Sequence, residues 1–404
     1  IRGNRIKEIR SSQGGERKDT ADVRHVDASG LTVIPGLWDP HIHPLTLYQG
    51  GQFGQISALL LAYGITSTQS VAGPVHQSLE IRESLEAGRL IGPRVFISPP
   101  LWEGNRLFYS FARTLRTPAI AQLEIDKALR LDVDYLKSYV RGPIPNMALI
   151  AQAGLDFGIP TGTHMLAPGA AVGLGGTTHL SATQRMGYGW SKSTNGITYQ
   201  DAADLHAKSG FNNVDTLFSS LALVGNDPAF TADDRFRLLV PPNFIAGLQQ
   251  TTAPTPEQLT GIQRDAEQSA KVQRAGGLLA IGTDSPLVAP GIALHTNLRA
   301  AAMAYSNYQA LQNVTLNAAR VSFVDKDLGS IEVGKLADFA MVKGNPLEDL
   351  KAAADVRMVM KNGVAMTLDE ILAPFRTPAA MAARSEALAA WSKLCDDGGA
   401  DCHP

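Results

Sequence analysis

The sequence predicts an α/β protein: a (β/α)8 TIM-like barrel with a small β-sandwich formed by the N- and C-terminal segments. Strand-like apolar runs alternate with helix-like amphipathic runs from about residue 33 to 320. Both ends instead carry short strand-and-turn stretches with glycine punctuation, which is typical of hairpins. A chain of 404 residues is long for one ordinary domain but fits a large barrel with a small partner domain. Eight strands that each pair with a helix favour a closed barrel over an open sheet.

The elements follow from the pattern in order. Strands are expected at residues 32–39, 65–71, 93–100, 133–140, 159–165, 176–180, 211–220 and 278–286. Helices are expected between them at residues 53–64, 76–90, 117–131, 145–158, 168–175, 198–210 and 255–277. Gly64 stands where the first helix should stop, and Pro118 stands near the start of the third, as the conformational preferences of these residues favour.

The chain ends predict the second domain. Residues 3–10 and 22–30 read as short strands and turns, and so do residues 329–344 and 355–366. We expect residues 1–36 and 328–368 to form the β-sandwich, residues 37–327 the barrel, and residues 369–404 a helix and tail. Residues 225–258 form a long insertion after the seventh strand, where barrel loops build specificity.

Composition limits the class of partner. The chain has 36 Lys and Arg against 38 Asp and Glu, a formal net charge of −2, which argues against nucleic acid. No apolar run has the length of a membrane span and no signal peptide is visible. The start at Ile1 resembles a piece of a longer protein or a processed product. Cys395 and Cys402 are either free thiols or a disulfide, and a disulfide would indicate an oxidising compartment.

Metal-ligand side chains stand at the ends of the predicted strands. They are His41, His43, Lys137, His164, His179 and Asp284. The C-terminal ends of the strands form the rim that holds the active site in such barrels. Because residues i and i+2 of a strand face the same side, the two histidines of "DPHIHP" present both imidazoles to one ion.

The donor types predict the metal chemistry. Four histidines and one carboxylate suit zinc or a similar cation. Five protein ligands exceed the needs of one open catalytic zinc but fit two metals. Two neighbouring cations should lower the pKa of Lys137, and its neutral amine could then take up carbon dioxide and become a bridging carbamate.

These segments resemble the amidohydrolase superfamily. "DPHIHP", "YLKSYV", "THM", "THLSAT" and "GTDSP" occur in the superfamily's order, and "LGSIEVGKLADFAMVKGNPLED" with "VMKNGV" is similar to its closing sandwich segment. The chain looks most like the imidazolonepropionase-like and prolidase-like branch, in which the fourth strand supplies a carboxylated lysine. The chain also resembles bacterial proteins in which such a module follows a β-propeller.

The resemblance implies a role for each position. His41 and His43 would hold the more buried metal with Asp284, and His164 and His179 would hold the more exposed one. Carboxylated Lys137 would bridge two divalent ions, with Zn²⁺ favoured over Mn²⁺, Co²⁺ or Fe²⁺. Asp284 would take a proton from the bridging hydroxide and pass it to the leaving group. The sequence departs from many relatives at Thr177 and Thr178, where they carry an acidic residue just before the sixth-strand histidine.

The predicted function is hydrolysis of an amide or peptide-like C–N bond. N-acyl amino acids, Xaa-Pro dipeptides or cyclic amides are the substrates that the resemblance implies. Lactonase or phosphotriesterase-type ester hydrolysis at the same site is the enzymatic alternative, because the same hydroxide attacks any polarised ester. A catalytically silent module that partners a missing N-terminal domain is the non-enzymatic alternative. All six ligands are present, which favours the enzyme.

The remaining expectations concern substrate and environment. Substrate-binding candidates near the predicted mouth are His76, Tyr109, Arg113, Tyr139 and Arg141. An arginine among them could bind a substrate carboxylate. We expect His295 to pack or cap on the last helix, and His25, His206 and His403 to lie at the surface. A homo-oligomer or a fused N-terminal propeller is the expected protein partner, and a periplasmic or secreted location is favoured.

Overall fold

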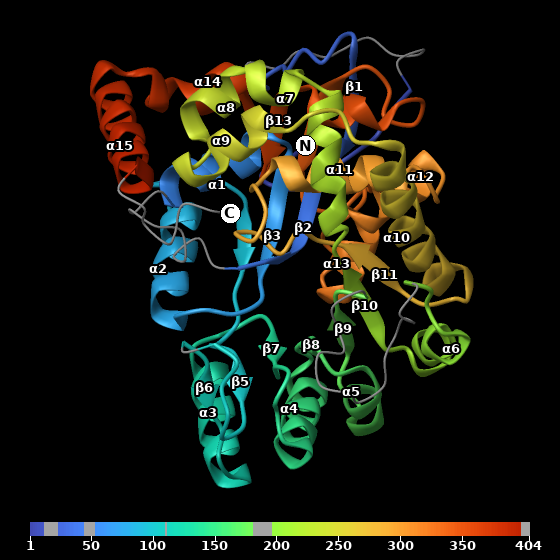
Figure 1. The fold of residues 1–404 in the computed structure, drawn as a ribbon. Coiled ribbons are helices and arrows are strands. Elements are labelled where there is room, and N and C mark those ends of the chain that lie inside the picture. The colour runs from blue at the N-terminus through green and yellow to red at the C-terminus, as the bar shows by residue number, and fades with distance from the viewer. Residues whose placement is uncertain (12–22, 44–52, 110, 181–195, 397–404) are drawn as a thin grey trace.

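The computed structural model describes residues 1–11, 23–43, 53–109, 111–180 and 196–396, with the backbone alone for 394–396. Strands from the two ends of the chain share one antiparallel sheet, and the strands between them are parallel (Figure 1). The predicted α/β fold with a separate sheet of N- and C-terminal strands is therefore confirmed. Cys402 and His403 fall outside the described residues, as does the side chain of Cys395.

Eight parallel strands occur in the predicted order within the described residues. They are β2 (Leu37–Ile42), β3 (Ile65–Ser70), β4 (Arg94–Phe96), β7 (Leu136–Lys137), β8 (Thr161–Thr163), β9 (Gly176–Thr178), β10 (Asn212–Asp215) and β11 (Leu279–Ile281). Backbone ladders join them as two sheets, β2-β3-β4 and β7-β8-β9-β10-β11. An isolated bridge between Ile42 and Ser285 connects the outer strands β2 and β11. Asp134 N donates to Ile97 O at 2.8 Å between the segments of β4 and β7.

The first predicted strand is two strands. Residues 32–39 were expected as one element, but β1 (Leu31–Pro35) belongs to the antiparallel sheet and β2 begins at Leu37. Gly36 is the junction, and its N–H donates to Asp338 O at 2.9 Å. A Cβ on Gly36 would lie 2.0 Å from Thr66 Oγ1, so only glycine allows the chain to change sheets against β3.

The antiparallel sheet has the order β1-β12-β13-β14. Its other strands are β12 (Phe339–Lys343), β13 (Val356–Lys361) and β14 (Val364–Thr367). Asn362 and Gly363 connect β13 to β14 with φ values of 51° and 76°, which the tightest hairpin turns require and which Asn-Gly favours. Near the N-terminus, Arg5 forms an isolated bridge to Leu336, so the predicted N-terminal piece lies beside this sheet.

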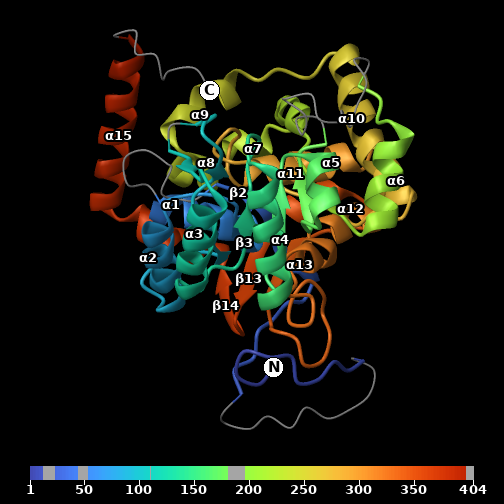
Figure 2. The ribbon, with the colours of Figure 1, turned by 90° about the horizontal axis from the view of Figure 1, so that it is seen from below.

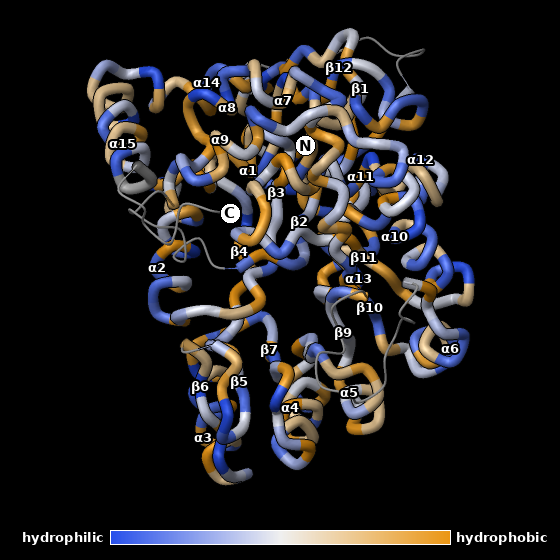
Figure 3. The backbone as a smooth tube through the Cα atoms, in the orientation of Figure 1, coloured by the Kyte–Doolittle hydropathy of each residue, from blue (hydrophilic) through white to orange (hydrophobic). Residues whose placement is uncertain are grey.

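Helices surround the parallel strands (Figure 2). Those near the predicted positions are α1 (Phe53–Ala62), α2 (Val75–Glu86), α3 (Pro118–Arg130), α4 (Ile144–Phe157), α5 (Leu166–Val172), α6 (Gln200–Ser209) and α10 (Pro256–Arg274). The chain then forms α11 (Ile292–Ala301), α12 (Asn307–Asn313), α13 (Leu316–Val321), α14 (Leu368–Leu372) and α15 (Pro378–Asp396). Two short 3-10 helices, η4 (Leu350–Ala354) and η5 (Ala373–Arg376), lie in the C-terminal part. Hydrophobic and hydrophilic residues alternate along helices such as α3 and α4 (Figure 3), as expected for helices with one packed face.

The insertion after the seventh strand has structure of its own. It contains η3 (Phe218–Asn226), α7 (Ala229–Ala232), α8 (Asp234–Leu239) and α9 (Pro242–Gln250).

Two short strands, β5 (Trp102–Glu103) and β6 (Arg113–Thr114), were also absent from the prediction, because two-residue strands have no hydrophobic period. Among the described helices, none combines the length and the hydropathy that crossing a membrane requires.

The core between strands and helices fixes the ends of the strands. All six residues of β3 are buried, and so are all six of β2. Trp38 in β2 is fully buried and stacks on Phe96 of β4, with ring centroids 5.2 Å apart. A strand that is buried on both faces has one register, so the C-terminal end of β2 has a defined position.

Candidate metal centre

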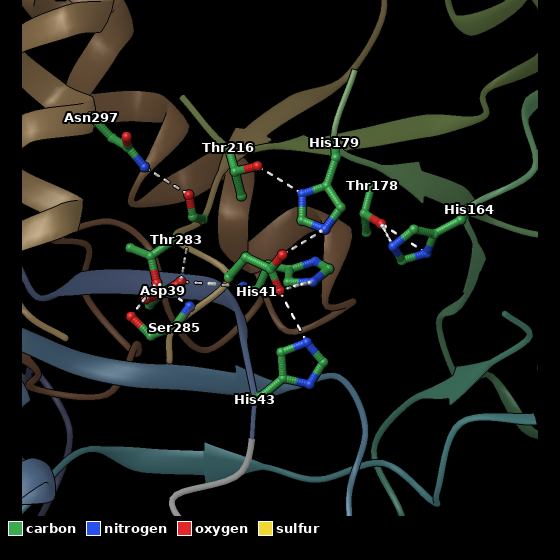
Figure 4. Close-up of polar contacts among 12 residues, drawn as sticks. Asp39, His41, His43, His164, Thr178, His179, Thr216, Thr283, Ser285 and Asn297 are labelled. Carbon is green, nitrogen blue, oxygen red and sulfur yellow. Dashed lines mark hydrogen bonds and ion pairs between the residues drawn. The ribbon is translucent and has the colours of Figure 1, made fainter. Parts of the chain in front are cut away.

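The six predicted ligands lie at the C-terminal ends of parallel strands. His41 lies in β2 and His43 follows it directly, while Lys137 ends β7. His164 and His179 each follow the last residue of their strand, β8 and β9. Asp284 comes three residues after β11. Figure 4 shows His41, His43 and His179 pointing toward one another, with His164 beside them.

His41, His179 and Asp284 form the centre of the cluster. Each is buried, and one ligand atom from each lies within 4.8 Å of the other two. Asp284 Oδ1 lies 3.3 Å from His41 Nε2, and Asp284 Oδ2 lies 3.2 Å from His179 Nε2. The ring centroids of His41 and His179 are 4.4 Å apart. Two imidazoles and a carboxylate at this spacing can share one cation.

His43 and His164 extend this cluster on two sides. His43 Nε2 lies 3.0 Å from Asp284 Oδ1. The His164 ring lies 5.1 Å from the His179 ring and 6.4 Å from the His41 ring, measured between centroids. Three imidazoles therefore face one carboxylate, and a fourth lies beside two of them.

Lys137 is the unusual member of the predicted set. Its side chain is fully buried, and its Nζ has no hydrogen-bond partner among the described residues. Burial lowers the pKa of Lys137 to about 7, because an apolar environment disfavours the ammonium form. Burial alone therefore lowers the pKa of Lys137, in the direction that the sequence predicts for a lysine beside two cations.

The electrostatics favour donors that are ready to bind a cation. Burial, followed by the charge of Lys137, holds the pKa of His41 and of His164 well below the usual value, so both rings are neutral near pH 7. Burial alone would raise the pKa of Asp284, but His179, His41 and His43 hold it well below its usual range. His41 and His164 are therefore neutral imidazoles and Asp284 is an ionised carboxylate, which are the protonation states that bind metal.

The donor set fits a divalent cation. Buried His41 Nδ1, His41 Nε2 and Asp284 Oδ1 make no hydrogen bond of normal geometry within the described part of the chain. Buried polar atoms without partners are costly, and two of these atoms, His41 Nε2 and Asp284 Oδ1, lie 3.3 Å apart, which indicates a shared ligand. His41, His43 and Asp284 could hold one ion, and His164, His179 and Lys137 could contribute to a second.

Hydroxyl groups orient two of the imidazoles. His179 Nδ1 lies 2.7 Å from Thr216 Oγ1, just after β10. Thr178 Oγ1 lies 3.3 Å from His164 Nδ1. Sequence reasoning noted that Thr178 replaces an acidic residue but missed Thr216, because nothing in "FNNVDTLFSS" marks one threonine. Such contacts fix the ring orientation of a ligand.

A buried aspartate, Asp39, was also missed. It lies in β2, two residues before His41, and its carboxylate contacts Thr283 beside Asp284. Burial raises the pKa of Asp39 to about 7, against hydrogen bonds from Thr283 and His41 that lower it. The sequence signal that could have identified Asp39 is its position in β2, two residues before His41.

The predicted substrate residues occupy different surroundings. The buried Tyr139 ring lies 4.5 Å from the His164 ring and 5.7 Å from the Tyr109 ring, measured between centroids. Arg141 Nη1 donates to Leu107 O at 2.6 Å. Arg113 Nη2 pairs with Glu124 at 2.9 Å. His76 is exposed in the first turn of α2. The structure therefore brings Tyr139 alone of these five into contact with a predicted ligand ring, within the described residues.

Two predictions about other histidines had different outcomes. His295 is buried on α11, where its Nε2 lies 2.9 Å from Tyr63 O, so the expected packing role is confirmed. His206 was expected at the surface, which is wrong: it is 1% exposed, with Nδ1 2.6 Å from Phe211 O. His206 lies on the buried face of α6. The sequence of this short polar helix does not indicate which of its faces is buried. His25 is exposed as expected.

Comparisons with known proteins agree with this geometry. Residues 243–366 match the model of the Amidohydrolase family. Imidazolonepropionase from Geobacillus sp. (strain WCH70) is 24% identical over 369 residues, which cover 82% of this chain and 78% of that protein. A prolidase in complex with N-methylphosphonate-L-proline superimposes with a TM-score of 0.66 at 20% identity, over 91% of this chain and 93% of the other. A putative prolidase from Bifidobacterium longum gives a TM-score of 0.65 at 19% identity, over 93% and 92%.

The family match covers β11, Asp284 and the strands β12 and β13 of the antiparallel sheet, while the structural likeness extends over 91% of the chain. A buried cluster of two histidines and an aspartate stands where these elements meet. Residues 243–366 therefore match an amidohydrolase, the fold of the chain is similar to that of solved amidohydrolases and prolidases, and the buried cluster is a candidate metal site.

Proposed function

We propose that the protein hydrolyses an amide or peptide-like C–N bond in a small molecule, with His41, His43, Lys137, His164, His179 and Asp284 as the metal ligands. The observation that carries the proposal is the convergence of His41, His43 and His179 on the Asp284 carboxylate, within 3.3 Å. The eight parallel strands would form the single barrel that presents these residues, with the domain boundaries that the sequence predicts.

Two divalent ions, with zinc favoured, fit the donor set. His41, His43 and Asp284 would hold the first ion, and His164 and His179 the second. When bound, such a pair of ions acidifies water and polarises a carbonyl oxygen. Lys137, with its buried Nζ and lowered pKa, is suited to react as a neutral amine with carbon dioxide and to bridge the ions as a carbamate.

Asp284 is the proposed acid–base group. Its carboxylate is 5% exposed and ionised, so it can accept a proton at an Oδ atom and deliver it to the leaving nitrogen. Thr216 keeps the His179 ring in place from the side opposite Asp284. Low solvent exposure of the whole group strengthens these charge interactions.

N-acyl amino acids, Xaa-Pro dipeptides and cyclic amides are the proposed substrates. A structurally similar prolidase binds N-methylphosphonate-L-proline, which supports a small substrate that contains an amino acid. The Tyr139 ring beside His164 supports an apolar contact for the substrate near the second ion. The rings of Tyr109 and Phe111 stack, with centroids 5.0 Å apart. They extend this aromatic surface beyond Tyr139.

Metal content and hydrolysis together test the proposal. Elemental analysis of the purified protein, with and without bicarbonate, should give close to two divalent ions per chain, with uptake promoted by bicarbonate. The metal-loaded protein should then release amine from a panel of N-acyl amino acids and Xaa-Pro dipeptides. Faster hydrolysis of lactones or phosphotriesters would instead assign ester chemistry to the same residues. Two bound ions without turnover of any of these substrates would contradict the proposed activity.

A further inference from the structure

We infer that Asp39 is a positioning residue that sets the geometry of the metal site by fastening β2 to the segment after β11. The inference rests on the proposed metal ligands but concerns a residue that contacts no proposed ligand atom. Asp39 is fully buried in β2, and its carboxylate reaches across to Thr283. Figure 4 shows Asp39, Thr283 and Ser285 gathered on one side of the histidines.

Backbone hydrogen bonds at the junction between the strand ends join β2 to the segment after β11, including Thr283 N to His41 O at 3.2 Å. The two strands belong to different sheets, and an isolated bridge between Ile42 and Ser285 joins their ends. Backbone bonds there include Asp284 N to His41 O at 2.7 Å and His43 N to Ser285 O at 2.7 Å. The ligands of the proposed first ion come from both sides of this junction, so a shift of one strand against the other would separate them.

The Asp39 carboxylate accepts three hydrogen bonds, two of them from Thr283 across this junction. Oδ1 accepts hydrogen bonds from Thr283 N at 3.0 Å and from His41 N at 3.3 Å. Oδ2 accepts from Thr283 Oγ1 at 2.5 Å. One carboxylate therefore holds the backbone of a ligand in β2 and the residue directly before the ligand Asp284.

Thr283 carries this restraint to both sides of Asp284. Ser285 N donates to Thr283 Oγ1 at 3.1 Å, and Ser285 Oγ donates to Val288 O at 3.0 Å. Asp284 has φ of 61°, a left-handed conformation that is unfavourable for residues other than glycine unless the surroundings hold it. The chain Asp39–Thr283–Ser285 supplies such a hold, because it fixes the residues before and after Asp284.

The restraint matters for metal binding, because a metal ion tolerates only small changes in the positions of its ligands. Zn–N and Zn–O bonds are about 2.0–2.2 Å long, and displacement of supporting groups around a metal ligand typically costs about 10–100-fold in affinity or activity. In Asp39→Asn the amide NH2 would face Thr283 Oγ1, which would then have to accept instead of donate, so the bond from this hydroxyl to Oδ2 would be lost. The restraint therefore depends on the carboxylate and on the threonine hydroxyl together.

The test uses metal affinity as its main readout. Apo-protein of the wild type and of Asp39→Asn, Thr283→Val and Thr283→Ser would be titrated with Zn²⁺ against a chelator, and the Co²⁺-loaded forms compared by visible absorption. Asp39→Asn and Thr283→Val should each weaken Zn²⁺ binding about tenfold or more and alter the Co²⁺ spectrum. Thr283→Ser retains the hydroxyl, so it should restore affinity to within about twofold to threefold.

Asp338→Asn is the matched control. The Asp338 carboxylate is also buried and also accepts a backbone hydrogen bond, from Asn362 N at 2.7 Å, but it lies at the antiparallel sheet. Its variant should lower the thermal midpoint and leave Zn²⁺ affinity unchanged. If Asp39→Asn behaved like this control, Asp39 would be merely structural and the inference would be wrong. Should Asp39→Asn fail to fold, Thr283→Val with the serine rescue decides the question.

The outcome separates this inference from the proposed function. Weaker metal binding in Asp39→Asn supports the positioning role even if the wild type hydrolyses no amide, which would overturn the proposed activity alone. Normal metal binding in both Asp39→Asn and Thr283→Val, in a wild type that does hydrolyse amides, would overturn the positioning role alone. A wild type that takes up no metal would overturn both.

Discussion

The Nε2 atom of His179 lies 3.2 Å from Oδ2 of Asp284, although β9 and β11, whose ends carry these residues, are separated in the sheet by β10. The same carboxylate lies within 3.3 Å of His41 and His43 through Oδ1. The two oxygens of Asp284 therefore face different imidazoles. This arrangement places the acid–base group between the two proposed ion positions.

Asp284→Asn should separate metal binding from proton transfer. The amide oxygen can still approach a cation, but the side chain cannot accept a proton, so kcat should fall by about 10²–10⁴-fold while most of the metal is retained. The measurement is kcat together with elemental analysis of the same preparation. Asp132→Asn is the control, because the Asp132 side chain is 99% exposed. Full activity of Asp284→Asn with metal bound would contradict the proton-transfer role.

Lys137→Met should remove the proposed metal-bridging group without destabilising the apo-protein. The Nζ group is buried without a described partner, so replacing it by an apolar side chain of similar length should leave the free energy of unfolding of the apo-protein unchanged or higher. Metal content should fall from about two ions to one or fewer, and hydrolysis by at least about 100-fold.

Lys361→Met controls for the loss of a partly buried lysine elsewhere. Lys361 Nζ donates to Gly92 O at 2.9 Å, beside the antiparallel sheet. This variant should keep its metal and its rate. A Lys137→Met protein that kept two ions and the full rate would show that Lys137 does not bridge.

Gly282→Ala should disturb both stability and metal binding. A Cβ at this position would lie 2.6 Å from His41 Cβ and 2.8 Å from His41 N, so β2 and the segment after β11 would have to move apart. We expect a loss of about 1–3 kcal/mol in the free energy of unfolding and weaker Zn²⁺ binding. Chemical denaturation of the apo-protein and a Zn²⁺ titration measure the two effects.

Gly261→Ala is the matched glycine substitution. Gly261 lies inside α10, where no atom other than those of the adjacent helix backbone and chain neighbours stands within 4 Å of the added Cβ. Alanine should therefore stabilise the helix by about 0.5–1 kcal/mol and leave metal binding unchanged. Equal effects of the two substitutions would contradict the close approach at Gly282.

His295 should make the protein sensitive to acid. Burial lowers its pKa to about 3, although the bond to Tyr63 O opposes this. Between that value and the ordinary pKa near 6.5, the unfolded chain binds a proton that the folded protein does not, so the stability that His295 contributes is complete above about pH 6.5 and is lost as the pH falls. Each pH unit in this window corresponds to about 1.4 kcal/mol.

His295→Gln should flatten this part of the pH dependence. Glutamine can still donate to Tyr63 O but does not titrate. Between pH 6.5 and 5 the difference in free energy of unfolding between the apo-forms of wild type and variant should change by about 2 kcal/mol in favour of the variant. Urea denaturation across this range gives the measurement. His25→Gln, at an exposed position, should follow the wild-type curve, and a parallel course for His295→Gln would contradict the prediction.

The sequence by itself determined which residues stand at the ends of the strands. Buried strands and amphipathic helices have local periods, so the positions of His41, Lys137, His164, His179 and Asp284 at strand ends were predicted from pattern alone. The Asn-Gly turn at residues 362–363 was likewise implied by its local chemistry. Their assignment to a metal-dependent hydrolase followed from the order of these residues along the chain.

Only the tertiary structure decided which side chains meet. Gly36 divides one apolar run into β1 and β2, because Thr66 leaves no space for a Cβ. Thr216 and Asp39 join the site because β10 and β2 bring them to His179 and Thr283. Arg141 donates to Leu107 O, 34 residues earlier in the chain. Such contacts depend on register and on packing between segments far apart in the chain, which no local pattern encodes.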